Sequence, residues 1–145
     1  MPAEILRYRL LNPMLKAVEG TISCVCMALD HGWSINLSGG YHHASKNSGG
    51  GFCIYPDITF AVHHLRKWHF DRVKKVLIID LDAHQGNGYE RDFLNDVDVF
   101  ILDCFNPLEI INLVIFTQGT TMLDRQLKRK FLSATDTLIR SIILL

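Results

Sequence analysis

The sequence lacks several features that define common classes of protein. It has no apolar run near the roughly 20 residues that a membrane-spanning helix needs. Its first ten residues, MPAEILRYRL, lack the long apolar core of a signal peptide. It has no net charge, because 15 basic side chains balance 15 acidic ones, so no overall field attracts nucleic acid or a membrane. We therefore expect an intracellular protein that binds neither nucleic acid nor membrane directly.

The sequence also has few cysteines, and none is arranged as a metal or disulfide motif. The four are Cys24, Cys26, Cys53 and Cys104, and no two of them form a CxxC pair. In a reducing compartment such thiols stay reduced, and we interpret them as small buried hydrophobic residues. The 145 residues, 48% of them apolar, are enough for one compact domain.

The first third of the chain predicts a helix, a short strand and a long loop. Residues 15–31 have helical apolar spacing and end at Gly32; the apolar positions are Ile22, Val25, Cys26 and Leu29. The segment WSINL, residues 33–37, predicts a short buried strand. The glycine-rich segment SGGYHHASKNSGGGFC that follows predicts an irregular loop.

The middle of the chain predicts helices that alternate with strands. Pro56 and Asp57 favour the start of a helix, whose apolar stripe would be Ile58, Ala61, Val62, Leu65 and Trp68. Strands are predicted at 76–82 and 97–105, with a short helix near 88–95 between them. This alternation is typical of an α/β fold with a parallel central sheet that helices cover on both faces. After Pro107 the pattern weakens to a strand at 112–119 and a helix at 121–143.

Chemistry-bearing residues gather in VLIIDLDAHQGNG, residues 76–88. Asp80, Asp82 and His84 are two residues apart, so they start on one side of the strand as it ends. The carboxyl edge of a parallel sheet is where such folds place their sites, and these side chains are good zinc ligands. The alternative is structural: Asp80 caps a turn, Asp82 caps the next helix, and His84 packs at the surface.

A second group lies in the glycine-rich loop. GGYHHA places His42 and His43 next to two glycines that allow close approach of a ligand to the backbone. Adjacent histidines are suited to general acid–base chemistry near neutral pH, although they can also be solvent-exposed loop residues. The segment GGGF allows a ligand to approach the backbone closely at a second point, and this segment ends with the aromatic residue Phe52. The pair His63 and His64 lies on an apolar helix, and we interpret it as structural.

Taken together, GGYHHA, GGGFC and IIDLDAHQGNG resemble the zinc-dependent histone deacetylase family, in this order and at suitable spacing. The segments GWSIN, DITFAV, GNGYERDF and VFILD most resemble its class IV branch. The resemblance covers residues 5–106 and leaves 107–145 as a divergent tail. It implies a partial deacetylase domain over 1–145, with the three-layer α/β/α fold of arginases and deacetylases, incomplete in this chain.

The resemblance implies a role for each matching residue. Asp82 and His84 would bind the catalytic Zn²⁺, and His42 and His43 would transfer protons around the attacking water. Asp80 would orient His42. It would also share a structural K⁺ site with Asp103 and the backbone of Cys104. Gly51 and Phe52 would line the channel for the acyl-lysine chain. Asn87 stands where many members have an aspartate that orients the second histidine, and the class IV branch also has asparagine there.

These roles imply hydrolysis of the amide bond of N-acyl-lysine in histones or other proteins, in the nucleus or the cytoplasm. Zinc would polarise the amide carbonyl and acidify the attacking water. A histidine would accept the proton of that water, and a histidine would protonate the departing lysine amine. The implied function is chromatin regulation.

The sequence departs from the family pattern toward its C-terminus. The third zinc ligand, an aspartate in a later AGxD segment, aligns with Thr121, whose hydroxyl is a poor substitute. The late tyrosine that stabilises the oxyanion has no counterpart, because Tyr8, Tyr41, Tyr55 and Tyr89 all lie in other contexts. We expect a gene-model or splice-form fragment, or a degenerate paralogue, with little or no turnover alone. A pseudoenzyme that binds acyl-lysine or a protein partner is the alternative function.

Overall fold

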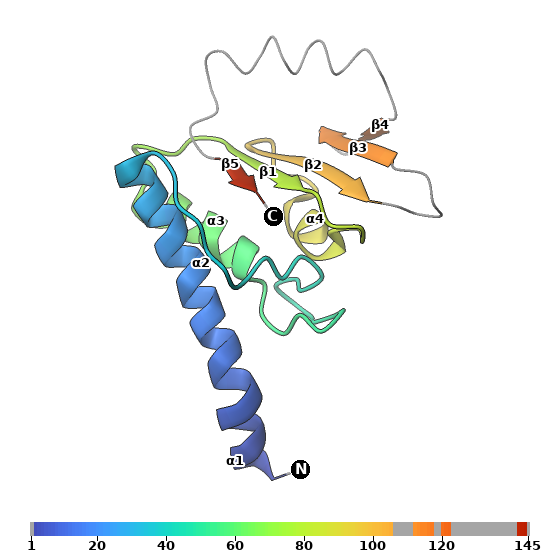
Figure 1. Ribbon diagram of the computed structural model, residues 1–145. Coiled ribbons are helices and arrows are strands. Elements are labelled where there is room, and N and C mark those ends of the chain that lie inside the picture. The colour runs from blue at the N-terminus through green and yellow to red at the C-terminus, as the bar shows by residue number, and fades with distance from the viewer. Residues whose placement is uncertain (1, 106–111, 118–119, 123–141, 145) are drawn as a thin grey trace. The chain divides into compact units, whose positions relative to one another are not determined.

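The computed structural model describes residues 2–105, 112–117, 120–122 and 142–144 and divides the chain into two compact units. One, the helical unit, comprises residues 1–68 with 87–92, and the other, the sheet unit, comprises 69–86 with 93–145. Figure 1 labels their elements. No helix in the described part of the chain is long and apolar enough to cross a membrane.

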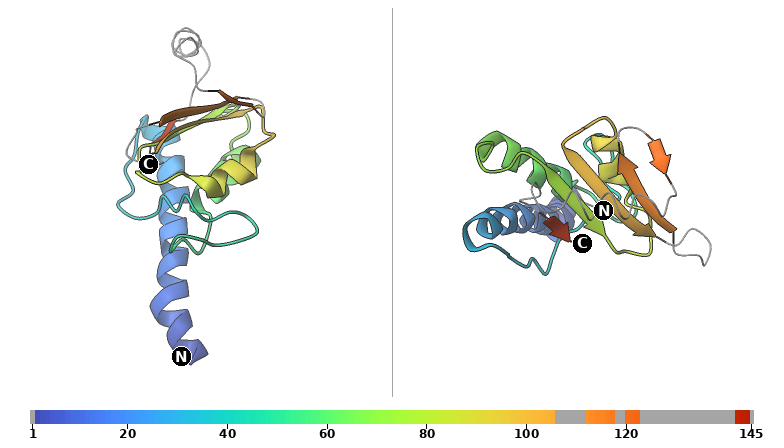
Figure 2. Two further views of the ribbon diagram at one scale, coloured as in Figure 1. Left: turned by 90° about the vertical axis from the view of Figure 1, so that its right-hand side faces the viewer. Right: turned by 90° about the horizontal axis from the view of Figure 1, so that it is seen from above.

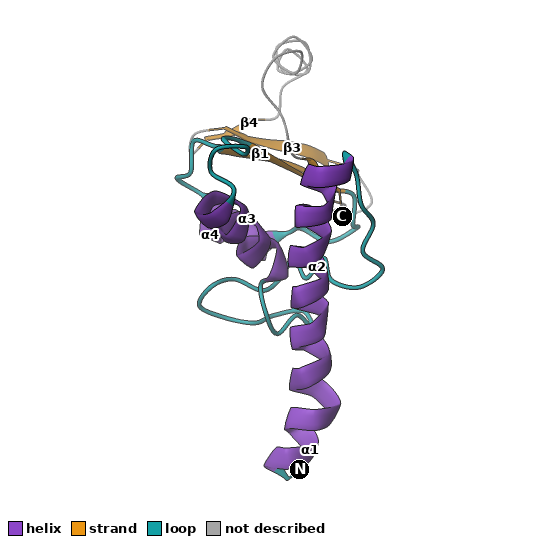
Figure 3. Ribbon diagram, turned by 90° about the vertical axis from the view of Figure 1, so that its left-hand side faces the viewer, coloured by secondary structure: helices purple, strands orange, loops and turns teal. Residues whose placement is uncertain are grey.

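A continuous helical rod opens the helical unit (Figure 3). Its three segments are α1 (Ala3–Leu6), the π-helical turn η1 (Arg7–Leu11) and α2 (Asn12–His31). The helix predicted at 15–31 is therefore confirmed, and it begins earlier than expected. It ends at Gly32, which has a left-handed φ of 90° and donates its N–H to the carbonyl of Ala28 at 2.8 Å. The predicted apolar stripe is only half-buried, and the buried positions of α2 are Ala17, Val18 and Thr21.

The predicted strand at 33–37 is wrong. These residues form an extended, irregular segment, and Trp33, Ile35 and Leu37 are exposed. The alternation is present, but its polar side faces α2. Oγ of Ser34 lies 2.9 Å from Sγ of Cys24, and Nδ2 of Asn36 donates to Oγ1 of Thr21 at 3.0 Å.

Helix α3 (Asp57–Trp68) follows the glycine-rich loop and packs against α2. It begins at Asp57 as the sequence predicts. Its stripe of Ile58, Ala61, Val62 and Leu65 is fully buried, which confirms the predicted face. Trp68 is the exception: it is exposed at the last position of the helix, beside the ammonium of Lys67 at 4.7 Å. A residue at the end of a helix has no further turn to hold it against a core.

The sheet unit contains one mixed sheet in the order β4-β3-β2-β1-β5 (Figure 2). Its strands are β1 (Val76–Asp80), β2 (Val99–Phe105), β3 (Asn112–Thr117), β4 (Thr120–Met122) and β5 (Ile142–Leu144). β1 pairs in parallel with β2 and β5, whereas β3 pairs antiparallel with β2 and β4. The expected parallel sheet is thus correct for β1, β2 and β5, and two antiparallel strands extend it.

The predicted boundaries differ from the observed ones by about two residues. β1 ends at Asp80 rather than at residue 82, β2 begins at Val99, and α4 runs Asn87–Phe93. The strand predicted at 112–119 is observed as β3. Most of the helix predicted at 121–143 lies outside the described residues. Its two ends, at 121–122 and 142–143, belong to strands instead.

Leu65→Ala should destabilise the protein much more than Phe60→Ala, although both residues lie on α3. Leu65 is 1% exposed, whereas Phe60, a larger side chain, is 41% exposed. Emptying a buried site costs about 2–5 kcal/mol because neighbours relax only partly. Chemical denaturation of the two variants measures the difference, and equal losses would contradict the observed orientation of the helix.

Candidate functional site

The irregular segment 38–53, which we name the histidine loop, presents His42 and His43. Two tight turns shape it, with isolated bridges between Ser45 and Ser48 and between Gly50 and Cys53. His42 is buried, and the imidazole rings of His42 and His43 lie 4.1 Å apart at an interplanar angle of 44°. The loop therefore holds the two predicted proton-transfer side chains as a close pair.

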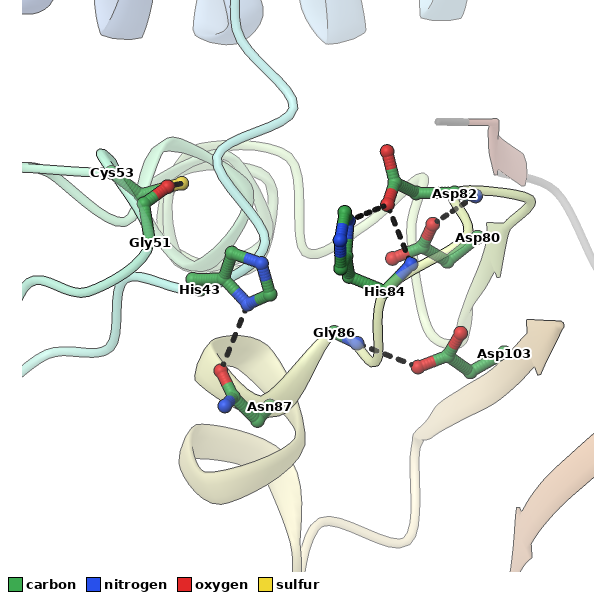
Figure 4. A network of polar contacts seen from close by, with 9 residues as sticks. All are labelled: His43, Gly51, Cys53, Asp80, Asp82, His84, Gly86, Asn87 and Asp103. Atoms are coloured by element: carbon green, nitrogen blue, oxygen red, sulfur yellow. Dashed lines mark hydrogen bonds and ion pairs between the residues drawn. The ribbon is translucent and has the colours of Figure 1, made fainter. Parts of the chain in front are cut away.

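Helix α4 holds this pair from its first turn. The N–H of Gly88 donates to the carbonyl of His42 at 2.8 Å, and Nδ1 of His43 lies 3.2 Å from Oδ1 of Asn87 (Figure 4). An amide oxygen only accepts, so Nδ1 of His43 must carry the hydrogen in this contact. The neutral ring then has its basic lone pair on Nε2, which is the form that a general base needs. The predicted orienting role of Asn87 thus has a direct geometric basis.

The second glycine segment lies against the same histidine. Gly51 has a left-handed φ of 49°, and a Cβ there would collide with the ring of His43. Phe52 also has a positive φ, 63°, and its ring is fully exposed. A non-glycine residue in this conformation costs free energy, and such strain is common at functional sites. The ring of Phe52 is open to solvent, and its place in the wall of a substrate channel stays a prediction.

In the sheet unit, Asp80 and Asp103 are the last buried pair of β1 and β2. They are in register on neighbouring parallel strands, and both are fully buried. Neighbouring strands lie only about 4.8 Å apart. An ionised carboxylate is costly to bury, and a cation beside such a pair would offset that cost. The donor chemistry therefore fits a cation at this position.

The turn after β1 is built on aspartate side chains (Figure 4). Oδ1 of Asp80 accepts the N–H of Asp82 at 2.9 Å, and Oδ2 of Asp103 accepts the N–H of Gly86 at 2.8 Å. Oδ1 of Asp82 accepts the N–H of His84 at 2.7 Å. The structural alternative for Asp80 is thus observed. Asp82 does not cap the next helix, because the N-cap of α4 is Gly86, without a side-chain bond.

Asp82 and His84 converge on one point. Nδ1 of His84 lies 3.0 Å from Oδ1 of Asp82, and the two side chains are 77% and 50% exposed respectively. Two ligands bound to one tetrahedral zinc lie about 3.3 Å apart, given bonds of about 2.0–2.1 Å. The pair therefore fits two corners of a zinc site, whereas a catalytic zinc needs three protein ligands. Thr121, which the sequence analysis aligns with the third ligand, lies in β4.

Cys104 of β2 and Cys26 of α2 are both half-buried. Cys104 lies opposite Leu113 of β3, and the role of its backbone at a K⁺ site stays a prediction. In α2, burial and the neighbouring Asp30 carboxylate raise the pKa of Cys26. Its thiol therefore stays protonated at neutral pH. The expectation that the cysteines are buried is correct for Cys53, whereas Cys24, Cys26 and Cys104 are only half-buried.

Sequence reasoning missed three residues that hold the histidine loop. Asp57 was expected only to start a helix, yet its carboxylate accepts the N–H groups of Gly40 and Tyr41, both at 2.8 Å. Asp92 of α4 accepts the N–H of Lys46, at 2.9 Å to its Oδ2. Gly88 was seen only as part of a motif. The partners lie 16 to 46 residues away in the sequence, so no local pattern could have revealed them.

Comparison with known proteins finds one family and several relatives. A family model described as a histone deacetylase domain matches residues 3–110. Histone deacetylase 2 of Arabidopsis thaliana is 45% identical over 108 residues, 73% of this chain and 27% of that protein. An uncharacterized Picosynechococcus protein is 42% identical over 59% of this chain and 28% of its own, and Histone deacetylase 1 of Homo sapiens is 43% identical over 41% and 12%. The chain thus spans about a quarter of the length of the first two relatives.

Gly88→Ala should destabilise the protein, although alanine normally favours a helix by about 1 kcal/mol over glycine. A Cβ at Gly88 would collide with the backbone carbonyl of Ala44 and would lie 2.7 Å from the carbonyl oxygen of His42. Backbone atoms cannot rotate away, so we expect a loss of about 1–3 kcal/mol. Thermal denaturation measures it. Gly50→Ala is the control, since its nearest neighbour is at 3.4 Å, and a stabilised Gly88→Ala variant would contradict the packing.

Proposed function

Because the chain belongs to the histone deacetylase family, we propose that it carries the histidine pair and two zinc ligands of a zinc-dependent protein-lysine deacylase. Family membership also assigns the α/β fold of arginases and deacetylases, of which the described residues form a part. The observation that carries the proposal is the convergence of Asp82 and His84, whose ligand atoms lie 3.0 Å apart. Activity, substrate and partners of the whole protein are part of this proposal.

Asp82 and His84 would hold the zinc ion through Oδ1 and Nδ1. When bound, zinc supplies a Lewis acid that polarises the substrate carbonyl and lowers the pKa of water. The residues of this chain would do the rest. His43, with Nδ1–H directed at Asn87, accepts a proton from water at Nε2, while His42 lies beside it. The proton then passes to the lysine nitrogen as the amide C–N bond breaks, which yields a carboxylate and a free lysine amine.

A second ion is proposed at the buried carboxylates. Asp80 and Asp103 lie in register on neighbouring parallel strands, and both are fully buried. A monovalent cation such as K⁺ would neutralise the pair, with the backbone near Cys104 as a further oxygen ligand. Such an ion would fix the end of β1 and hence the turn that carries Asp82 and His84. The role of Asp80 toward His42 stays a prediction.

The substrate proposed is an acylated lysine of a histone or another protein. Gly51 and the exposed ring of Phe52 would form one wall of the channel for the aliphatic lysine chain. The class IV branch is proposed from the segments 32–36, 57–62, 86–93 and 99–103. Nuclear or cytoplasmic placement is proposed from the family alone.

A second candidate function is binding without turnover. The alignment with the family motif puts Thr121 at the position of the third zinc ligand, and a hydroxyl is a poor substitute for a carboxylate there. A pseudoenzyme with this composition would grip an acyl-lysine side chain or a partner protein and would not hydrolyse the amide. The two candidates differ in one measurable property, which is turnover of an acyl-lysine peptide.

The folded chain should bind about one zinc ion, and His84→Ala and Asp82→Asn should remove it. Both ligands are at least half exposed, so these substitutions leave the core intact. Elemental analysis after dialysis against zinc measures the stoichiometry. His63→Ala, which removes an exposed histidine of α3, is the matched control and should keep its zinc. If wild type holds no more zinc than the His84→Ala variant, the zinc proposal fails.

The isolated chain should show little or no deacylation of an acetyl-lysine peptide, even when saturated with zinc. A threonine hydroxyl at the proposed position of the third ligand is a poor substitute for a carboxylate, so we expect a weakened metal site. Mass spectrometry of the peptide measures release of acetate. Robust turnover that His84→Ala abolishes would contradict this expectation. Peptide binding without turnover, measured by fluorescence anisotropy, would favour the second candidate.

A further inference from the structure

The first turn of α3 and the histidine loop are joined through one buried carboxylate. Asp57 is fully buried, and its two oxygens accept three hydrogen bonds. Oδ2 accepts the N–H of Gly40 at 2.8 Å and the hydroxyl of Thr21 at 2.7 Å, and Oδ1 accepts the N–H of Tyr41 at 2.8 Å. A buried charge is tolerated when donors surround it in this way, and such charge-assisted bonds are the strong ones.

Thr21 and Asn36 complete the set of donors. Nδ2 of Asn36 donates to Oγ1 of Thr21 at 3.0 Å, which leaves the single hydroxyl hydrogen of Thr21 for Asp57. The carbonyl of Ala17 lies farther from the same hydroxyl, at 3.2 Å, than the carboxylate does. The relay from Asn36 through Thr21 to Asp57 therefore has one consistent direction of donation.

The glycines of the loop are required for this arrangement. Gly39 and Gly40 have φ values of 105° and 72°, which L side chains rarely adopt. A Cβ on Gly39 would lie 2.6 Å from Oδ2 of Asp57 and would also collide with the hydroxyl of Thr21. The left-handed backbone turns successive N–H groups toward one anion, in the manner of an anion-binding nest. Here the anion is part of the protein itself.

The carboxylate of Asp57 holds the backbone at the residue directly before the histidine pair. Tyr41, whose N–H is held, directly precedes His42, and the N–H of His42 donates to the carbonyl of Gly40 at 2.9 Å. Any rotation of the peptide between Gly40 and Tyr41 would therefore move both imidazole rings. The other side of the pair is held by Gly88 and Asn87 of α4.

We propose that Asp57 is a positioning residue for His42 and His43, and that Thr21 and Asn36 act through it. Its carboxylate is fully buried and sets the direction of the two rings through the backbone of Gly40 and Tyr41. The interpretation of the rings as proton-transfer groups rests on the proposed function. Their placement by Asp57 does not, so the two ideas can fail separately.

The test compares the imidazole signals of wild type and the Asp57→Asn variant of the full chain. Asparagine keeps the shape but turns an NH₂ group toward a backbone donor. In long-range proton–nitrogen NMR spectra, we expect several-fold larger shifts for His42 and His43 than for the other five histidines. The Nδ1–H signature of His43 should also weaken. Zinc and turnover play no part in this readout, so the failure of the deacylase proposal would leave it unaffected.

Two further variants separate positioning from stability alone. Asp92→Asn loosens the far end of the loop, at Lys46, and should lower the melting temperature while leaving both ring signals near wild type. If the folded Asp57→Asn variant behaves in the same way, the proposal is overturned. If that variant does not fold, Thr21→Val decides: it removes one donor and keeps both backbone bonds. Shifts confined to His42 and His43 support the proposal, and unchanged signals overturn it.

Discussion

Hydrogen bonds from backbone amides to aspartate carboxylates hold the loops that carry the candidate site. Five carboxylates do so, each from an element end or a turn: Asp57, Asp80, Asp82, Asp92 and Asp103. Loops rich in glycine lose much conformational entropy when they become ordered, and they have few side chains to pack. Bonds to an ionised acceptor are about twice as strong as neutral ones, which suits them to this task. The shape of the candidate site therefore depends on aspartate carboxylates that support the backbone, and Asp82 among them is also a proposed zinc ligand.

The elements that the sequence predicts well are those whose pattern is local. Helix α3 shows its buried face through spacing alone, and β1 is a continuous apolar run that ends in a carboxylate. The segment 33–37 shows the limit of prediction from a local pattern. Its alternation correctly separates two sides of an extended chain, but it does not say which side faces the protein. Hydrogen bonds from Ser34 and Asn36 to α2 decide that, and they place the apolar side in solvent.

The sequence predicts the residue types of the candidate site, but it does not reveal the residues that support them. Residues proposed as ligands or proton-transfer groups have chemistry that a motif displays, so His42, His43, Asp82 and His84 stand out in the sequence. A residue such as Asp57 looks like an ordinary helix start, because its partners come from 16, 17 and 36 residues away. Only folding brings these groups together. Long-range hydrogen bonding to backbone is therefore the part of a site that sequence reading misses most easily.

The local origin of the ligand geometry bears on what the chain can do. Asp82 and His84 are brought together by the turn itself, through the bond from the N–H of His84 to Oδ1 of Asp82. This bond lies between residues two apart in the sequence and does not involve position 121, so a chain with threonine there keeps the two ligand atoms in place. A carboxylate has about four acceptor positions, so Asp82 can hold the turn and still bind a metal. The shape of this turn is therefore local: it depends on residues 82 and 84 and not on the residue at position 121.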